Sequence, residues 1–200
     1  MSALALAEVA RIVTEERDGA IAVTGPGAFA GQLYVADPDS ASLYNMELAY
    51  ATSTALGMAL ELPAERVISA EGDGSMLAAL GVLATITRYR PANLTVLILV
   101  NGIYGTGDNN IRTQTGVGGN LGGVALALGW DPTHVNRVAT ADELRARLVE
   151  ARSGAGPWLI EVMLDAGSHP KGAGRARPGV DVAESGVLLR RTIERRRAAR

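Results

Sequence analysis

Glu71-Gly72-Asp73-Gly74-Ser75 and, further along the chain, Asn101-Gly102-Ile103-Tyr104 each follow a short apolar run. The runs, residues 66–69 and 94–100, are rich in β-branched side chains, and such runs bounded by Gly or Asn are typical of buried strands. Residues 75–89 between them have the pattern of one amphipathic helix. The predicted order is therefore strand, acidic turn, helix, strand, Asn turn. Turns at the carboxyl ends of neighbouring parallel strands open onto one crevice, where open α/β sheets bind ligands.

Composition narrows the class of protein. The chain has 200 residues, enough for one domain with a sizeable core. A net charge of -2 and a pI near 5.7 give no overall attraction to nucleic acid or membranes. The chain has no cysteine, which excludes disulfides, thiolate zinc sites and iron–sulfur clusters on it and fits our expectation of a cytoplasmic protein. We also expect no membrane helix and no signal peptide, because long apolar runs and a basic N-terminal region are both missing.

Strands that alternate with helices predict an α/β fold, a three-layer doubly wound parallel sheet with helices on both faces. Outside the central stretch, we expect helices at 2–17 (capped by Ser2), 47–60 and 122–128, a helix behind the capping box Thr140–Glu143, strands at 20–24, 134–139 and 158–164, and a polar loop at 28–45. The small residues of the 47–60 helix allow close approach of a cofactor or a partner subunit, or simply close packing on the sheet.

We expect two parts in the chain. Residues 1–165 form the domain, and residues 166–200 form an irregular segment and an Arg-rich helix that begins near Ala183. We interpret the arginines of this helix as a solvated face near a helix C-terminus, where cations are favoured. An acidic partner or nucleic acid is the alternative, and we expect no nucleic-acid partner.

The two turns carry oxygen ligands suited to a hard cation. Asp73 offers a carboxylate between glycines, Ser75 a hydroxyl, and Asn101 an amide oxygen followed by main-chain carbonyls. Mg²⁺ prefers oxygen ligands and commonly combines one or two protein groups with phosphate oxygens and water. The pattern predicts a Mg²⁺-diphosphate site, although Gly-Asp-Gly alone is an ordinary turn. Gly25, in a Gly-Pro-Gly turn after a predicted strand, is either a further anion contact or a plain turn.

The stretch also resembles a known signature. Gly72-Asp73-Gly74-Ser75, the 26 residues that separate Gly74 from Asn101, and the Asn101–Tyr104 turn are similar to the thiamine diphosphate motif, which opens with Gly-Asp-Gly and closes with Asn. Residues 4–164 resemble the diphosphate-binding (PP) domain of thiamine diphosphate enzymes.

Within that family, residues 80–86 and 89–94 make the chain most similar to the separate β subunit of sulfopyruvate or phosphonopyruvate decarboxylases. One departure stands out. Residues 27–30 read Gly-Ala-Phe-Ala, where decarboxylase relatives tend to have polar residues that hold phosphates or substrate.

By position, the resemblance implies side-chain Mg²⁺ ligands at Asp73 and Asn101 and a main-chain carbonyl ligand at Ile103. Leu48 falls where relatives prop the cofactor into its bent conformation, and Met46 where a backbone carbonyl meets the aminopyrimidine and relatives usually have Gly. The full set of expected cofactor contacts is Gly25, Met46, Leu48, Gly72, Asp73, Gly74, Ser75, Asn101, Ile103 and Tyr104.

The resemblance implies no catalytic residue in this chain. In the family, a glutamate from a pyrimidine-binding (PYR) domain activates the aminopyrimidine, and 200 residues hold only one such unit. We therefore expect a subunit that binds thiamine diphosphate and Mg²⁺ and joins a PYR-domain partner in a hetero-oligomer such as α2β2 or larger. The expected reaction is decarboxylation of a small 2-oxo acid, or acyl transfer (carboligation) through a carbanion/enamine.

Two alternatives remain open at this point. One is a non-catalytic subunit that retains the PP fold, and the other is a subunit of a 2-oxo acid:acceptor oxidoreductase. Of the two histidines, we interpret His134 as structural, and His169 reaches a site only if the Gly-rich tail folds over the crevice. Arg112 and Gln114, in the polar loop 105–120, are the better substrate-contact candidates.

Overall fold

A parallel sheet forms the centre of the molecule, as the alternation of strands and helices predicts. The computed structural model describes residues 4–38, 41–105, 111–165 and 176–200. In that part of the chain the main sheet has six strands, in the order β2 (Ser42–Leu43), β1 (Ile21–Thr24), β3 (Val67–Gly72), β4 (Leu94–Val100), β8 (Trp158–Met163) and β7 (Val135–Val138), and every neighbouring pair is parallel. All residues of β1 and β4 are buried, as expected for strands covered on both faces.

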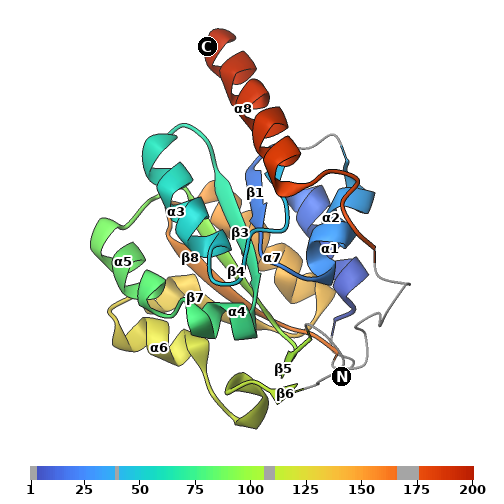
Figure 1. Cartoon of the computed structure of the whole chain (residues 1–200). Helices are drawn as coiled ribbons and strands as arrows, with labels where there is room; N and C mark the ends of the chain where they lie inside the picture. The colour runs from blue at the N-terminus through green and yellow to red at the C-terminus, as the bar shows by residue number, and fades with distance from the viewer. Residues whose placement is uncertain (1–3, 39–40, 106–110, 166–175) are drawn as a thin grey trace.

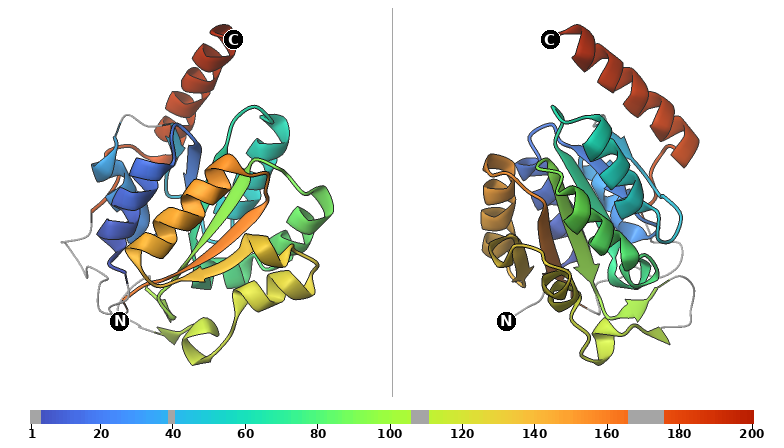
Figure 2. Two further views of the ribbon diagram at one scale, coloured as in Figure 1. Left: turned by 180° about the vertical axis from the view of Figure 1, so that it is seen from behind. Right: turned by 90° about the vertical axis from the view of Figure 1, so that its left-hand side faces the viewer.

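Helices cover both faces of this sheet, and Figure 2 shows the sheet between the two layers. One layer consists of α1 (Leu6–Glu16), α2 (Ala28–Ala36) and α7 (Ala141–Ser153), and the other of α3 (Ala51–Glu61), α4 (Asp73–Ala78), α5 (Gly81–Tyr89) and α6 (Leu121–Ala127). A separate hydrophobic cluster lies under each layer. The predicted three-layer doubly wound fold is therefore confirmed.

Two sequence predictions about helices are wrong. Residues 28–36, expected in a polar loop, form α2, whose Phe29 and Leu33 are buried against α1 and the sheet. Gln32 is the one strongly polar side chain within it, so the segment is more apolar than the loop on either side suggests. The single helix expected at 75–89 is two, because the chain bends at Ala79 and Leu80, and the bend lets Met76 of α4 and the buried residues of α5 reach one core.

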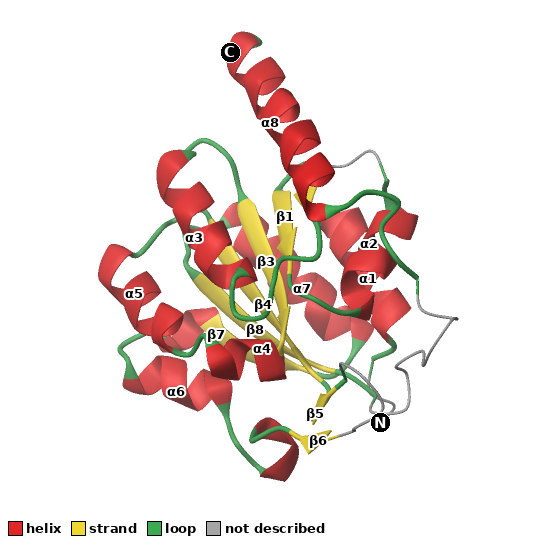
Figure 3. Ribbon diagram, in the orientation of Figure 1, coloured by secondary structure: helices red, strands yellow, loops and turns green. Residues whose placement is uncertain are grey.

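The carboxyl edge of the sheet carries the turns that the sequence singles out. From β1 the chain passes to β2 on one side and then to β3 on the other, so the connections diverge between β1 and β3, where doubly wound sheets bind ligands. α4 and the antiparallel pair β5 (Ile103–Tyr104) and β6 (Ile111–Arg112) lie together at this edge, in the lower part of Figure 3.

The last helix, α8 (Val182–Ala198), packs against edge strand β2 and projects beyond the body of the domain (Figure 1). Its buried Leu189 belongs to the same hydrophobic cluster as Leu43 of β2. Its arginines are not only a solvated face, so that interpretation needs correction. Arg196 and Arg200 donate to the buried carboxyl group of Glu65 at 2.7 and 2.6 Å. Among the described residues, every helix is too short or too polar to span a bilayer.

Several boundaries follow the predictions closely. β4 spans the predicted residues 94–100, and α7 begins with the predicted capping box, in which Thr140 accepts the Glu143 N–H at 3.3 Å. Glu143 in turn accepts the N–H groups of Ala139 and Thr140, and these bonds lower the pKa of its carboxyl group. The predictions about Ser2, His169 and residues 106–110 and 166–175 lie outside the described residues.

Leu189 and Leu188 test how α8 is attached. Leu189 is 3% exposed and Leu188 is 46% exposed. Leu189→Ala removes buried methyl groups and is expected to lower the free energy of unfolding by about 2–3 kcal/mol, whereas Leu188→Ala should change it by less than about 0.5 kcal/mol. Urea denaturation of both variants measures the difference, and equal effects would show that α8 does not pack on the domain as described.

Candidate functional site at the carboxyl edge of the sheet

Strand pairing brings Asp73 and Asn101 to the same edge. β3 pairs with β4 so that Gly72 lies opposite Leu99, and Asp73 and Asn101 are the residues that directly follow the two strands. Asp73 is 1% exposed although it starts a helix. The Asn101 side chain accepts the N–H of Ile103 at 3.0 Å, which fixes the turn that leads into β5.

Two hydroxyl groups hold the Asp73 carboxyl group. Thr113 donates to its Oδ2 at 2.7 Å, and Thr115 donates to the same oxygen. In the described part of the chain no donor reaches Oδ1, so this oxygen is available to a cation. Both threonines lie just after β6, where a sequence pattern of scattered small polar residues gave no sign that they would converge on Asp73.

The Tyr104 side chain packs on the turn at Gly74. A Cβ atom added to Gly74 would lie 2.5 Å from the Tyr104 ring, so only glycine permits this contact. The backbone of Gly74 and the ring of Tyr104 therefore pack directly together. Strand pairing and the contact between Gly74 and Tyr104 therefore bring five predicted residues together at this edge of the sheet: Asp73, Gly74, Asn101, Ile103 and Tyr104.

Glu71 is the functional candidate that the sequence analysis did not include. It is fully buried, and three groups donate to it: Ser75 Oγ at 2.6 Å, Thr52 Oγ1 at 2.7 Å and Thr52 N at 3.2 Å. The Ser75 hydroxyl in turn accepts the N–H of Ala49 at 2.8 Å. The available signal was a glutamate at the end of an otherwise apolar strand, where a charged residue needs buried partners.

The segment that carries Met46 and Leu48 lies beside this network. The Met46 N–H donates to the Thr24 carbonyl at 2.9 Å, at the end of β1. Leu48 is 46% exposed although it is apolar. Gly25 follows β1, and a Cβ there would lie 3.3 Å from Cγ of Glu71. The structure thus gathers the predicted residues of three segments at the point where the chain connections diverge.

Other predicted candidates lie around this centre or away from it. Arg112 and Gln114 are exposed on the hairpin side of the site. His134 stacks on Trp158 with ring centroids 4.1 Å apart, as the structural interpretation expected. Within the described residues, no three His, Cys, Asp or Glu side chains gather as a metal site. A cation at this edge would therefore rely on one carboxylate with amide and carbonyl oxygens.

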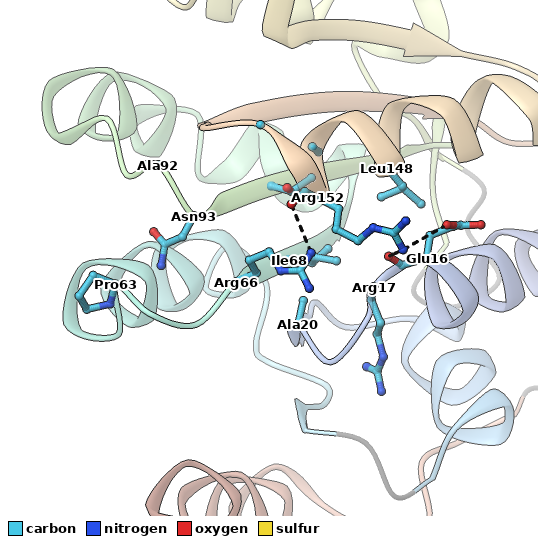
Figure 4. A pocket seen from close by; sticks show the side chains of 13 residues that line it. Glu16, Arg17, Ala20, Pro63, Arg66, Ile68, Ala92, Asn93, Leu148 and Arg152 are labelled. Atoms are coloured by element: carbon cyan, nitrogen blue, oxygen red, sulfur yellow. Dashed lines mark hydrogen bonds and ion pairs between the residues drawn. The ribbon is translucent and has the colours of Figure 1, made fainter. Parts of the chain in front are cut away.

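A cavity of about 240 Å³ lies at the opposite, amino edge of the sheet (Figure 4). Its charged side chains already have partners: Arg66 donates to Asp18 at 2.9 Å, and Arg152 pairs with Glu16 at 3.7 Å. It is remote from Asp73 and Asn101, and we regard it as a gap between packed elements rather than the functional site.

Comparisons with known proteins identify the family of this chain. The family model for the thiamine pyrophosphate enzyme, C-terminal TPP binding domain, matches residues 29–162. The chain is 31% identical to a phosphonopyruvate decarboxylase of Streptomyces viridochromogenes over 90% of its own length and 43% of the relative's. It is 33% identical to the sulfopyruvate decarboxylase subunit beta of Methanocaldococcus jannaschii over 62% of its own length and 65% of the relative's. The chain thus spans less than half of the phosphonopyruvate decarboxylase.

Solved structures share the fold. The thiamine diphosphate-dependent 4-hydroxybenzoylformate decarboxylase of Rhodococcus jostii RHA1 superposes with a TM-score of 0.68 at 21% identity, over 84% of this chain and 34% of that one. The benzoylformate decarboxylase of Polynucleobacter necessarius gives a TM-score of 0.68 at 19% identity, over 82% of this chain and 33% of that one. The predicted resemblance is confirmed, and the chain belongs to the family of C-terminal TPP-binding domains of thiamine pyrophosphate enzymes.

Proposed function

We propose that this chain is the diphosphate- and Mg²⁺-binding component of a two-component thiamine diphosphate enzyme that acts on a 2-oxo acid. The observation that carries the proposal is the meeting of the Asp73 and Asn101 turns at the carboxyl ends of adjacent parallel strands. Family membership supports the cofactor. The names of the phosphonopyruvate and sulfopyruvate relatives support decarboxylation of a 2-oxo acid.

In this proposal, Mg²⁺ is held by Asp73 Oδ1, the Asn101 amide oxygen and the main-chain carbonyl of Ile103. The two threonine hydroxyls on Oδ2 keep the Asp73 carboxyl group oriented. Three protein oxygens leave about half of the roughly six positions around Mg²⁺ for phosphate oxygens and water. Main-chain N–H groups of Gly74 and Ser75, in the first turn of α4, have no acceptor within the helix and are available to the diphosphate.

The Ser75 hydroxyl has a different role from the one its position in the motif suggests. Its single proton is directed to Glu71, and its lone pair accepts the Ala49 N–H. The side chain is therefore engaged within the protein. Ser75 contributes to diphosphate binding through its main-chain N–H, and its hydroxyl links the turn to the 45–50 segment.

The surroundings of Gly72 show whether this turn has room for the cofactor. Its φ of -65° suits any residue, and a Cβ there would have no heavy atom within 4 Å. Neither the backbone nor a protein neighbour therefore requires glycine at this half-buried position. An empty space beside Asp73 is what a bound diphosphate would fill.

Gly72→Ala should leave the free energy of unfolding within about 0.5 kcal/mol of wild type and should weaken thiamine diphosphate binding at least ~10-fold. Gly81→Ala is the matched control, since its Cβ also meets nothing within 4 Å but lies on α5. Gly74→Ala is expected to lower stability instead, because its Cβ would contact the Tyr104 ring. Thermal melts and titration calorimetry distinguish the three. Unchanged cofactor affinity in Gly72→Ala would contradict the placement of the diphosphate.

Bound thiamine diphosphate supplies the chemistry that stabilises negative charge at the carbon bearing the leaving carboxylate. This chain's residues bind and orient the diphosphate end, while Leu48 offers an exposed apolar side chain to the rest of the cofactor. We place the activating glutamate on a PYR-domain partner. The sulfopyruvate decarboxylase subunit beta among its relatives supports this division.

Asp73→Asn should abolish Mg²⁺-dependent activity on a 2-oxo acid when the chain is combined with a PYR-domain subunit, thiamine diphosphate and Mg²⁺. The amide keeps the size of the side chain but carries no negative charge to hold the cation. Carbon dioxide release from pyruvate, sulfopyruvate and phosphonopyruvate measures the activity. Wild-type rates in Asp73→Asn would overturn the metal assignment. Cofactor binding without turnover of any 2-oxo acid would favour a non-catalytic subunit.

A further inference from the structure

We propose that Glu71 is a positioning residue that holds two cofactor-binding segments, residues 72–75 and 46–49, at a fixed separation. The proposal rests on the proposed function, because it concerns the same site. It assigns a role to a buried carboxyl group that lies outside the expected set of cofactor contacts. Glu71 contacts neither the cation nor the substrate in this account, and acts through Ser75 and Thr52.

The hydrogen bonds of Glu71 connect three elements. Oε1 accepts from Ser75 of α4 at 2.6 Å, and Oε2 accepts from the hydroxyl and the N–H of Thr52 of α3 at 2.7 and 3.2 Å. Glu71 itself ends β3 and is fully buried. Buried hydrogen bonds of this kind hold their partners in place, because an unpaired buried polar group is costly.

Glu71 also determines what the Ser75 hydroxyl does. A hydroxyl group has one proton, and here that proton is directed to Glu71. The oxygen is thereby oriented to accept the N–H of Ala49 at 2.8 Å. The chain Glu71–Ser75–Ala49 joins the diphosphate turn to the segment that presents Leu48.

The segment needs this support because of its conformation. Ala49 has a φ of +74°, in the left-handed region that a residue with a Cβ seldom adopts. Its N–H is bound to Ser75, and the N–H of Thr52, three residues on, is bound to Glu71. Leu48 lies directly before Ala49 and is half exposed. The position of the Leu48 side chain therefore depends on the hydrogen bonds that Ser75 and Glu71 make to Ala49 and Thr52.

The turn at Gly25 also packs against the Glu71 side chain. A Cβ at Gly25 would lie 3.3 Å from Cγ of Glu71, so the turn after β1 rests against the Glu71 side chain. Glu71 thus lies between the three segments that carry Gly25, Met46 with Leu48, and the Asp73 turn. One residue sets the spacing between the diphosphate end and the opposite end of the cofactor site.

Glu71→Gln tests the proposal with little change in size. Gln has one acceptor oxygen and an NH2 group. Either the Thr52 N–H then faces another donor, or the Ser75 hydroxyl must turn its proton away and accept from the NH2 group, so the wild-type arrangement of bonds is lost. Ser69→Ala is the matched control. Ser69 is buried and its hydroxyl oxygen lies 3.3 Å from that of Thr52, whose proton is directed to Glu71; among the described residues, Ser69 forms no hydrogen bond with Ser75 or Ala49.

Two measurements on the full chain separate the outcomes. Calorimetry with Mg²⁺ compares inorganic pyrophosphate, which probes the diphosphate end alone, with thiamine diphosphate, which spans both ends. Glu71→Gln should weaken the binding of thiamine diphosphate at least ~10-fold and the binding of pyrophosphate less than ~2-fold. Ser69→Ala should leave the ratio of the two affinities unchanged. Equal weakening of both ligands in Glu71→Gln would overturn the proposal.

The second measurement needs no cofactor. Hydrogen exchange of the amides in residues 46–50 should quicken in Glu71→Gln and in Ser75→Ala, which removes the bridge but keeps the carboxyl group, and should not quicken in Ser69→Ala. Unchanged exchange of these amides in both Glu71→Gln and Ser75→Ala would overturn the proposal. If the wild-type chain binds neither ligand, the proposed function fails, and the exchange result still decides the role of Glu71.

Discussion

The register between β3 and β4 is the constraint on which the rest of the site depends. Because Gly72 pairs with Leu99, the residues after the two strands emerge side by side, and both are turn residues with oxygen-bearing side chains. A shift by one residue would reverse the faces of every side chain in the strand. The apolar residues of both strands are buried on both faces, so the core fixes the register that the site requires.

Hydrogen bonds between buried polar groups hold the two acidic side chains at the end of β3 in place. Asp73 is held from the β6 side by two threonines, and Glu71 is held from the α3 and α4 sides by Thr52 and Ser75. These two networks start from residues only two positions apart in the sequence but serve different segments. One orients the carboxyl group proposed to bind the cation, and the other links that turn to the segment carrying Met46 and Leu48.

Much of this arrangement could be predicted from the sequence, because β-branched runs, capping boxes and the spacing of the two turns are local signals. β4, the capping box at Thr140 and the order of strands and helices are examples. The rest depends on contacts between distant residues. Glu71 meets Thr52 across 19 positions and Asp73 meets Thr113 across 40, and no local pattern announces either pair. α2 was missed because its apolar residues follow no clear helical period beside a glycine turn, and its burial against α1 decides its structure.

The most direct test of the central claim replaces Mg²⁺ with Mn²⁺ and records paramagnetic relaxation of backbone amides in the presence of inorganic pyrophosphate. The account predicts that signals of residues 72–75 and 101–104 broaden together, since both turns surround one cation. Signals at the amino edge, such as those of Arg66 and Asn93, should remain sharp. Broadening at the amino edge, or at only one of the two turns, would contradict the account.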